Sequence, residues 1–199
     1  MNKLLSILKV LVHSGLFHAD EVFAVALRIA RATDWGLNLH NVCTGATGTT
    51  AVIEAGNPAF NCIITRTRDD KVISTFEGDI FDVGGVYEPG RSLEQGLRLD
   101  HHQGLKITQQ LGNETTIGYS SLGLLFKEIG VETLASFPDH GLDDEGIATV
   151  AERLKEILIY GIDGVDTGTM PPGDKHIYSI MQGISSFNPL NTDPEQSNA

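Results

Sequence analysis

Two short segments hold four of the chain's seven histidines, and each segment also contains an aspartate. Residues 13–20 are HSGLFHAD and residues 100–103 are DHHQ, and each segment directly follows a run of strand-like residues. Imidazole nitrogens and carboxylate oxygens together form a mixed nitrogen and oxygen site that suits a divalent ion such as Mn, Zn or Fe. The two segments therefore predict a metal site, and a metal-dependent hydrolase is the first hypothesis.

Three further aspartates stand near the expected end of a strand or helix. Asp82 lies near the end of a short apolar strand, and Asp163 and Asp166 fall in GIDGVDTG (161–168) at the end of a largely apolar helix. Carboxylates are costly to bury unless they are paired or metal-bound, and they are unfavourable at the negative end of a helix dipole. A metal site would explain the helix-end pair, and an exposed helix terminus is the alternative.

The spacing of the histidines limits how they can act together. His13 and His18 are five residues apart around a glycine, so they cannot share a helix face and can converge only from a tight loop. His101 and His102 would point to opposite sides of a strand, but both can face a site from a loop. The remaining histidines lack comparable carboxylate neighbours and are interpreted as ordinary polar residues: His40, His140 and His176.

Strand and helix signals alternate along the chain. Apolar runs predict strands over residues 4–12, 61–65, 79–83 and 97–99, whereas residues 34–60 are less regular. Periodicity and capping residues predict helices over 20–32, over 120–129 with an end at Gly130, from Asp143 or Asp144 to about Ile162, and over about 174–185. This alternation predicts an α/β fold with a mainly parallel sheet flanked by helices.

The metal-capable residues should meet at one edge of this sheet. Ligands of parallel sheets bind beyond the carboxyl ends of the strands. His13, Asp82 and the 100–102 segment each follow a different strand, so all three fall on that edge. This shared position is a stronger indication of a metal site than any single motif.

The composition is that of an ordinary soluble globular protein. A chain of 199 residues suits one domain, which we place at residues 1–190, with a polar tail over 191–199 that we expect to be disordered. No stretch approaches the roughly 20 apolar residues of a membrane helix, and residues 4–12 fit a buried strand better than a signal peptide. Cys43 and Cys62 favour buried, reduced thiols in the cytoplasm, with a single disulfide as the alternative. The oligomeric state stays open.

The net charge of −12 argues against a surface that coats nucleic acid, because phosphate binding usually needs a basic patch. Divalent ions would offset part of this charge locally and let an acidic cleft accept phosphate. The charge therefore makes broad electrostatic binding of nucleic acid unfavourable and leaves phosphate chemistry open.

Six segments, taken in order, resemble the Myg-type family. They are HSGLFHADE, ITRTRD, IFDVGG, DHHQ, YSSLGL and IDGVDTG, and the resemblance covers most of the chain from about residue 10 to Pro189. DHHQ alone is moderately specific, whereas the ordered set is highly specific. The resemblance implies a DHH-phosphoesterase-like core, similar to that of manganese-dependent exonucleases and pyrophosphatases. Longer members continue into a second, carboxyl-terminal region, which in DHH enzymes helps to bind substrate.

The resemblance implies a set of metal ligands. His13 and His18 look like ligands of one ion, and Asp20 and His101 look like ligands of a second. Asp82 is the implied bridge, because a carboxylate has two oxygens to share. The implied cofactor is a pair of divalent ions, most of all Mn²⁺, with Mg²⁺ or Zn²⁺ as alternatives.

Four more residues have implied roles at this site. Asp166 matches the family's last metal ligand better than Asp163, which stays the alternative. Asp100 would orient a neighbouring histidine without binding metal itself. His102 would lie close enough to contact a phosphoryl oxygen.

Together these residues imply hydrolysis of phosphodiester bonds. Two ions would activate water for in-line attack on phosphorus and neutralise charge on the phosphoryl oxygens. Arg66 or Arg68 could add a bidentate phosphate contact, with a solvated surface arginine as the alternative. The expected substrates are short single-stranded RNA or DNA, or small nucleotides, with no membrane partner. A metal-dependent amide or protein hydrolase and a catalytically weak metal-binding regulatory module are the alternatives.

Overall fold

The fold is built around a five-stranded sheet. The computed structural model describes residues 6–32, 50–54, 60–103, 107–111, 115–170 and 180–184. The strands, in the spatial order β2-β3-β1-β4-β5, are Thr50–Glu54, Phe60–Arg66, Ser6–Val12, Asp79–Phe81 and Arg98–Leu99. All neighbours run parallel except β2, which pairs antiparallel with β3. The predicted α/β class with a mainly parallel sheet is confirmed.

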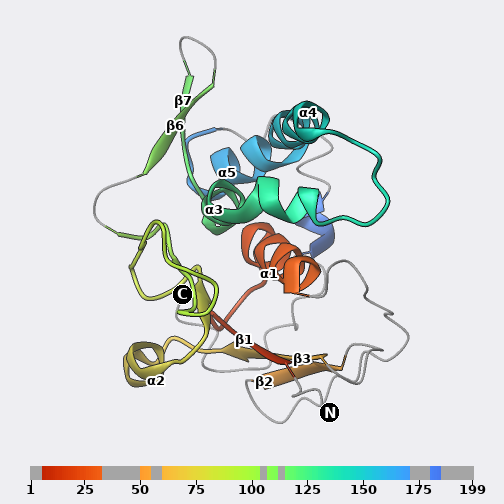
Figure 1. The fold of residues 1–199 in the computed structure, drawn as a ribbon. Helices are drawn as coiled ribbons and strands as arrows, with labels where there is room; N and C mark the ends of the chain where they lie inside the picture. Colours follow the sequence, from red (N-terminus) through yellow and green to blue (C-terminus); the bar gives the residue numbers. More distant parts are fainter. Residues whose placement is uncertain are drawn as a thin grey trace, which may run out of the picture.

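Helices cover both faces of this sheet. α1 (Ala19–Ala32) and α3 (Ser121–Ala135) pack on one face, and α2 (Asp70–Thr75) packs on the other. A further layer packs on α1 and α3 and consists of α4 (Asp144–Leu154), a π-helical turn (Lys155–Ile159) and α5 (Tyr160–Asp166). In Figure 1, α1 lies between the sheet and α3, and the β6–β7 hairpin (Thr108–Leu111 and Thr115–Gly118) extends away from these layers.

The central strand β1 explains how the sheet supports a site at one edge. Val10 and Val12 are buried beneath α1 and α3, and Leu11 is buried on the opposite face. Burial on both faces is why the second half of this strand, residues 10–12, is an apolar run without polar alternation. β1 pairs with β3 on one side and with β4 on the other, so the residue after it, His13, lies at the middle of the sheet edge.

α3 is apolar around most of its surface because it is buried between layers. Leu124 and Leu125 belong to the core against the sheet, and Leu122 and Phe126 pack toward the outer helices. The predicted end of this helix at Gly130 is wrong, since α3 continues to Ala135. A Cβ at residue 130 would lie 2.6 Å from the ring of Phe126, so this glycine makes room for a core aromatic inside the helix.

Several other elements differ from the sequence predictions. β2 lies in the stretch 34–60 that was interpreted as less regular, and neither α2 nor the β6–β7 hairpin was predicted. The long helix predicted from Asp143 or Asp144 is present, with Asp143 as the N-cap accepting from the amide of Gly146. A π-helical turn interrupts this helix, which runs on to Asp166.

Some predictions fall partly or wholly outside the described residues. Residues 180–184 of the helix expected over 174–185 are helical, and the polar tail 191–199, His40, His176 and Cys43 lie outside the described ranges. The assignment of residues 1–190 to one domain stays a prediction. Cys62 is buried, and burial raises the pKa of its thiol to about 12. In the described part of the chain, no helix combines the length and apolar character needed to cross a membrane.

Candidate metal centre

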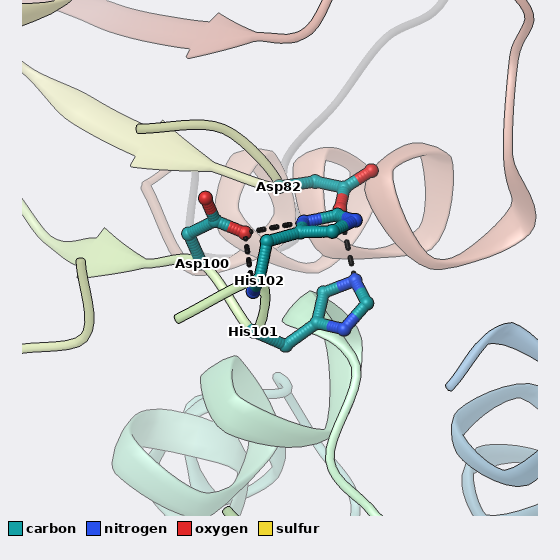
Figure 2. Close-up of side chains that lie close together, drawn as sticks. All are labelled: Asp82, Asp100, His101 and His102. Carbon is teal, nitrogen blue, oxygen red and sulfur yellow. Dashed lines mark hydrogen bonds and ion pairs between the residues drawn. The ribbon is translucent and has the colours of Figure 1, made fainter. Parts of the chain in front are cut away.

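Asp82 stands at the centre of a cluster of imidazoles and carboxylates. His101 Nε2 lies 3.0 Å from its Oδ1, and His13 Nε2 lies 3.2 Å from its Oδ2. His102 Nδ1 is 3.5 Å from Oδ1, and His18 Nδ1 is 3.9 Å from Oδ2. Figure 2 shows the side chains of His101 and His102 beside Asp82. Both oxygens of one buried carboxylate therefore face histidine nitrogens from two different loops.

The backbone after β4 places Asp82 in this position. Its φ of +57° lies in the left-handed region, which aspartate tolerates better than most residues. Its amide donates to the carbonyl of Leu99 at 3.2 Å and so ties it to the end of β5. Gly84 and Gly85 follow with φ values of +95° and +68°. The segment IFDVGG thus forms a left-handed turn that holds Asp82 at the sheet edge.

His13 reaches Asp82 from the loop that follows β1. Its Nδ1 lies 2.8 Å from the carbonyl oxygen of Ser14. A proton on Nδ1 that is donated there leaves the Nε2 lone pair free to bind a metal, the tautomer that such second contacts impose on metal-binding histidines. Nε2 lies 3.2 Å from Asp82 Oδ2 and 3.2 Å from Glu21 Oε2. The loop therefore presents the metal-binding nitrogen of His13 to two buried carboxylates.

The same loop brings His18 beside a second pair of carboxylates. Gly15, with a φ of +111°, turns the loop so that the ring centroids of His13 and His18 are 4.8 Å apart. One ligand atom from each of His18, Asp20 and Asp166 lies within 4.8 Å of the others. The side chain of His18 is 46% exposed and Asp20 is fully buried, so this group extends from the core to the surface.

Asp20 is a buried carboxylate with one unpartnered oxygen. Its Oδ2 accepts from the amide of Ser121 at 3.3 Å, at the first residue of α3, whereas Oδ1 has no hydrogen-bond partner among the described residues. Burial, followed by repulsion from Asp82 and Asp166, raises the pKa of Asp20 well above its ordinary value. A cation beside Oδ1 would relieve both effects.

Asp82 and His101 carry opposite pKa shifts. Burial alone would raise the pKa of Asp82, but the hydrogen bond with His101 and the contact with His13 hold that pKa well below its usual range. Burial alone would lower the pKa of His101, but its contacts with Asp166, at 3.1 Å, and with Asp82 raise that pKa to about 10. Positive charge on the histidines is thus one way to balance these carboxylates, and a divalent ion is another.

The chemistry of the cluster fits a divalent metal. Asp20 Oδ1 makes no hydrogen bond with the described residues, and His13 Nε2, Glu21 Oε2 and Asp82 Oδ2 contact one another at 3.2 Å without hydrogen-bond geometry. A buried polar atom left unsatisfied costs about 1–3 kcal/mol, so a cation beside Asp20 Oδ1 and between these carboxylates would stabilise the cluster. Imidazole nitrogen and carboxylate oxygen are the ligand types of first-row divalent metals.

Asp100 and His102 form a pair beside Asp82 (Figure 2). Asp100 Oδ1 lies 2.7 Å from His102 Nδ1 and accepts from the His102 amide at 3.1 Å, and its Oδ2 accepts from the amide of Gly85. Asp100 is buried, whereas the side chain of His102 is 60% exposed. A buried carboxylate therefore fixes the ring of an accessible histidine.

The two aspartates of the 161–168 segment lie in different environments. Asp166 belongs to the metal-capable cluster. Asp163 is fully buried and accepts four hydrogen bonds, from the amide and hydroxyl of Ser120, the amide of Gly123 and the side chain of Gln109. A Cβ at residue 123 would lie 2.0 Å from Asp163 Oδ2, so only glycine lets α3 approach this closely. Asp163 thus anchors the start of α3 and is not brought into the cluster.

Arg66 and Arg68 both contact the 13–18 loop. Arg66 donates to two carbonyl oxygens of this loop, lies 3.4 Å from Glu21 Oε1 and has its guanidinium carbon 3.8 Å from the ring centroid of Phe17. Arg68 is more exposed, and its Nη2 lies 3.2 Å from His13 Nδ1. The observed contacts give Arg66 a role in holding the loop, and its phosphate contact stays a prediction.

Sequence reasoning missed Glu21. Its side chain is 2% exposed, and its Oε1 accepts from the amide of His18 at 3.2 Å while Oε2 faces His13. Burial raises the pKa of Glu21 to about 7, against the opposing charges of His13 and Arg66. The signal was its place directly after Asp20 in HADE, but a glutamate in a first helical turn is usually solvated.

Comparisons with known proteins place the chain in a family. The MYG1 exonuclease family model, described as "Uncharacterised protein family (UPF0160)", matches residues 9–199. The chain belongs to this family. The predicted Myg-type membership is confirmed, whereas the relation to the DHH phosphoesterases stays a prediction.

Curated relatives match nearly the whole chain at low identity. The MYG1 protein of Schizosaccharomyces pombe is 27% identical over 192 residues, which is 92% of this chain and 49% of that protein. The MYG1 exonuclease of Rattus norvegicus is 26% identical over 98% of this chain and 45% of that protein. The MYG1 exonuclease of Homo sapiens is 27% identical over 84% of this chain and 37% of that protein. The chain thus spans about half the length of these relatives or less. No solved structure matches the chain significantly.

Proposed function

We propose that this chain is a metal-dependent phosphoesterase that hydrolyses phosphodiester bonds in short single-stranded nucleic acid or small nucleotides, acting as an exonuclease. The observation that carries the proposal is Asp82, whose two oxygens face imidazoles from two separate loops. A carboxylate shared in this way suits a pair of ions, the arrangement of many phosphatases and nucleases. The exonuclease names of the rat and human relatives support nucleic acid as the substrate class.

The proposed ligands lie after the ends of β1 and β4, in the DHHQ segment and at the ends of α1 and α5: His13, His18, Asp20, Asp82, His101 and Asp166. We propose Mn²⁺ as the ion, with Mg²⁺ or Zn²⁺ as alternatives. When bound, the ions would stabilise charge on the phosphoryl oxygens and lower the pKa of the attacking water. Glu21 would add negative charge beside His13.

The chain's own residues would orient the phosphate. Asp100 holds His102 through Nδ1, which leaves Nε2 of this exposed ring available to substrate. Because the Asp100 carboxylate occupies Nδ1, Nε2 is the ring nitrogen that can contact a phosphate group of the substrate. His102 is therefore the proposed substrate contact, and Asp100 is the residue that positions it.

The charge of the chain favours small substrates. A net charge of −12 offers few contacts to a long phosphate backbone. We therefore expect a dinucleotide or short oligonucleotide to be cleaved, and a long duplex to be cleaved poorly.

Assays of the manganese-loaded chain on dinucleotides, short oligonucleotides and pyrophosphate test the proposal. We expect manganese-dependent cleavage, and we expect His102→Ala to lower turnover while most of the manganese stays bound. A peptide substrate is assayed in parallel, and its cleavage in place of the phosphodiesters would support the amide hydrolase alternative. A fully loaded protein that cleaves none of these substrates would support the regulatory metal-binding alternative.

A further inference from the structure

A cavity of about 280 Å³ opens directly beside the proposed metal centre. His101, His102 and Asp166 line it together with Gln103, Ile107 and Tyr119. A ligand in this cavity would thus contact the proposed metal site and also Gln103, Ile107 and Tyr119, which have no proposed role in binding metal or phosphate. The volume lies just below the roughly 300–1,000 Å³ of typical small-molecule sites, which suits one nucleoside and not a length of strand.

Gln103 is the residue of the DHHQ motif that the proposed chemistry does not use. Its Oε1 is buried and has no hydrogen-bond partner among the described residues. Buried side-chain polar atoms are normally satisfied, so this oxygen needs a hydrogen-bond donor. An amide offers both an acceptor and two donors, the combination that reads the polar edge of a nucleobase.

Tyr119 supplies an aromatic surface in the same cavity. It follows β7 directly and precedes α3, and its amide donates to the carbonyl of Ile107 at 3.0 Å. The ring packs against the core beside the sheet, and the Nζ of Lys127 lies 5.4 Å from its centroid, so its position is held by its neighbours. Aromatic side chains stack on bases of any sequence, which makes such a ring suitable for an exonuclease that accepts many sequences.

We propose that this cavity binds the terminal nucleoside of the substrate, with its base against Tyr119 and the edge of that base hydrogen-bonded to Gln103. The proposal rests on the proposed phosphoesterase function. His101, His102 and Asp166 belong both to the cavity and to the proposed catalytic site, so the phosphate of a bound nucleotide would lie at the metal centre. A cavity for one nucleoside would favour cleavage at a strand end.

Binding measurements test the cavity separately from catalysis. Calorimetric titration of the manganese-loaded chain with nucleoside monophosphates and with ribose 5-phosphate isolates the contribution of the base. We expect the nucleotides to bind at least about fivefold more tightly, the lower limit for stacking one base on an aromatic side chain. Gln103→Leu and Tyr119→Leu should each reduce this preference, whereas Tyr119→Phe should retain most of it.

Matched controls separate base recognition from damage to the site. Gln110→Leu removes an exposed glutamine of the β6–β7 hairpin and should leave the preference unchanged. The proposal is overturned if wild type binds ribose 5-phosphate as tightly as the nucleotides. It is also overturned if Gln103→Leu and Tyr119→Leu both keep the full preference for nucleotides. The same holds if these variants lose affinity for manganese and for ribose 5-phosphate as much as they lose affinity for nucleotides. A preference for nucleotides without any phosphodiester cleavage would support nucleoside binding in the cavity and overturn the proposed function. Cleavage without such a preference would support the proposed function and overturn nucleoside binding in the cavity.

Discussion

Replacing Asp20 by asparagine should change the stability of the protein in opposite directions without and with manganese. Without metal, Asp20 Oδ1 is a buried oxygen that lacks a hydrogen-bond partner among the described residues and is repelled by Asp82 and Asp166. The amide of asparagine keeps an acceptor for the Ser121 amide and offers donors to the neighbouring carboxylates. Since one unsatisfied buried group costs about 1–3 kcal/mol, the free energy of unfolding should rise by about that amount in a chelator.

With manganese, the same substitution should lower stability relative to wild type. Loss of a residue that only supports a ligand typically weakens metal binding about 10–100-fold, and loss of a ligand should weaken it at least as much. At manganese concentrations well above both dissociation constants, a 100-fold weaker affinity removes about 2.7 kcal/mol of metal-linked stabilisation. The order of the two proteins should therefore reverse when manganese is added.

Urea unfolding in chelator and in saturating manganese measures both effects. Asp163→Asn is the matched control, because Asp163 is equally buried and also holds the start of α3, but it accepts four hydrogen bonds. This control should keep the full stabilisation by manganese. The proposed role of Asp20 as a metal ligand would be refuted if Asp20→Asn is less stable than wild type in chelator, or if manganese stabilises it as much as it stabilises wild type.

Three further predictions concern the same region. Asp82→Ala should lose more manganese than Asp100→Ala, because Asp82 contacts histidines of two separate loops whereas the proposed role of Asp100 is to orient His102. Equal metal content by elemental analysis would remove the case for a bridge. Arg66→Ala should weaken manganese binding about tenfold by loosening the 13–18 loop, and unchanged affinity by calorimetry would return Arg66 to a substrate role. Burial raises the pKa of Asp163 to about 7, so the folded protein holds a proton that the unfolded chain releases near pH 4. In chelator, the stability of wild type should therefore fall relative to Asp163→Asn as the pH rises from about 4 to 7, and parallel profiles would show that this carboxyl is ionised when folded.

The sheet edge could be predicted from sequence because local signals determine it. The apolar run of β1 identifies a strand buried on both faces, and His13 follows it directly. The same logic placed Asp82 and the DHHQ segment after β4 and β5. Parallel pairing then brings these strand ends together without any knowledge of side-chain contacts.

The remaining features depend on contacts between residues far apart in the chain. Asp163 and Asp166 are three residues apart on α5, and the close approach of α3 at Gly123 determines which of them is held by hydrogen bonds. Glu21 is buried because the 13–18 loop folds over it and Arg66 reaches it from β3. No local pattern encodes such packing, which is also why the helix end predicted at Gly130 is wrong.

The proposed function requires that paired ions at Asp82 enable phosphodiester cleavage. Its most direct test is the turnover of a dinucleotide measured against the number of manganese ions bound per chain, with turnover and metal content determined on the same samples. Under this proposal, turnover is absent in chelator and appears as binding passes from one ion to two. Full turnover in chelator, or two tightly bound ions without any cleavage, would contradict it.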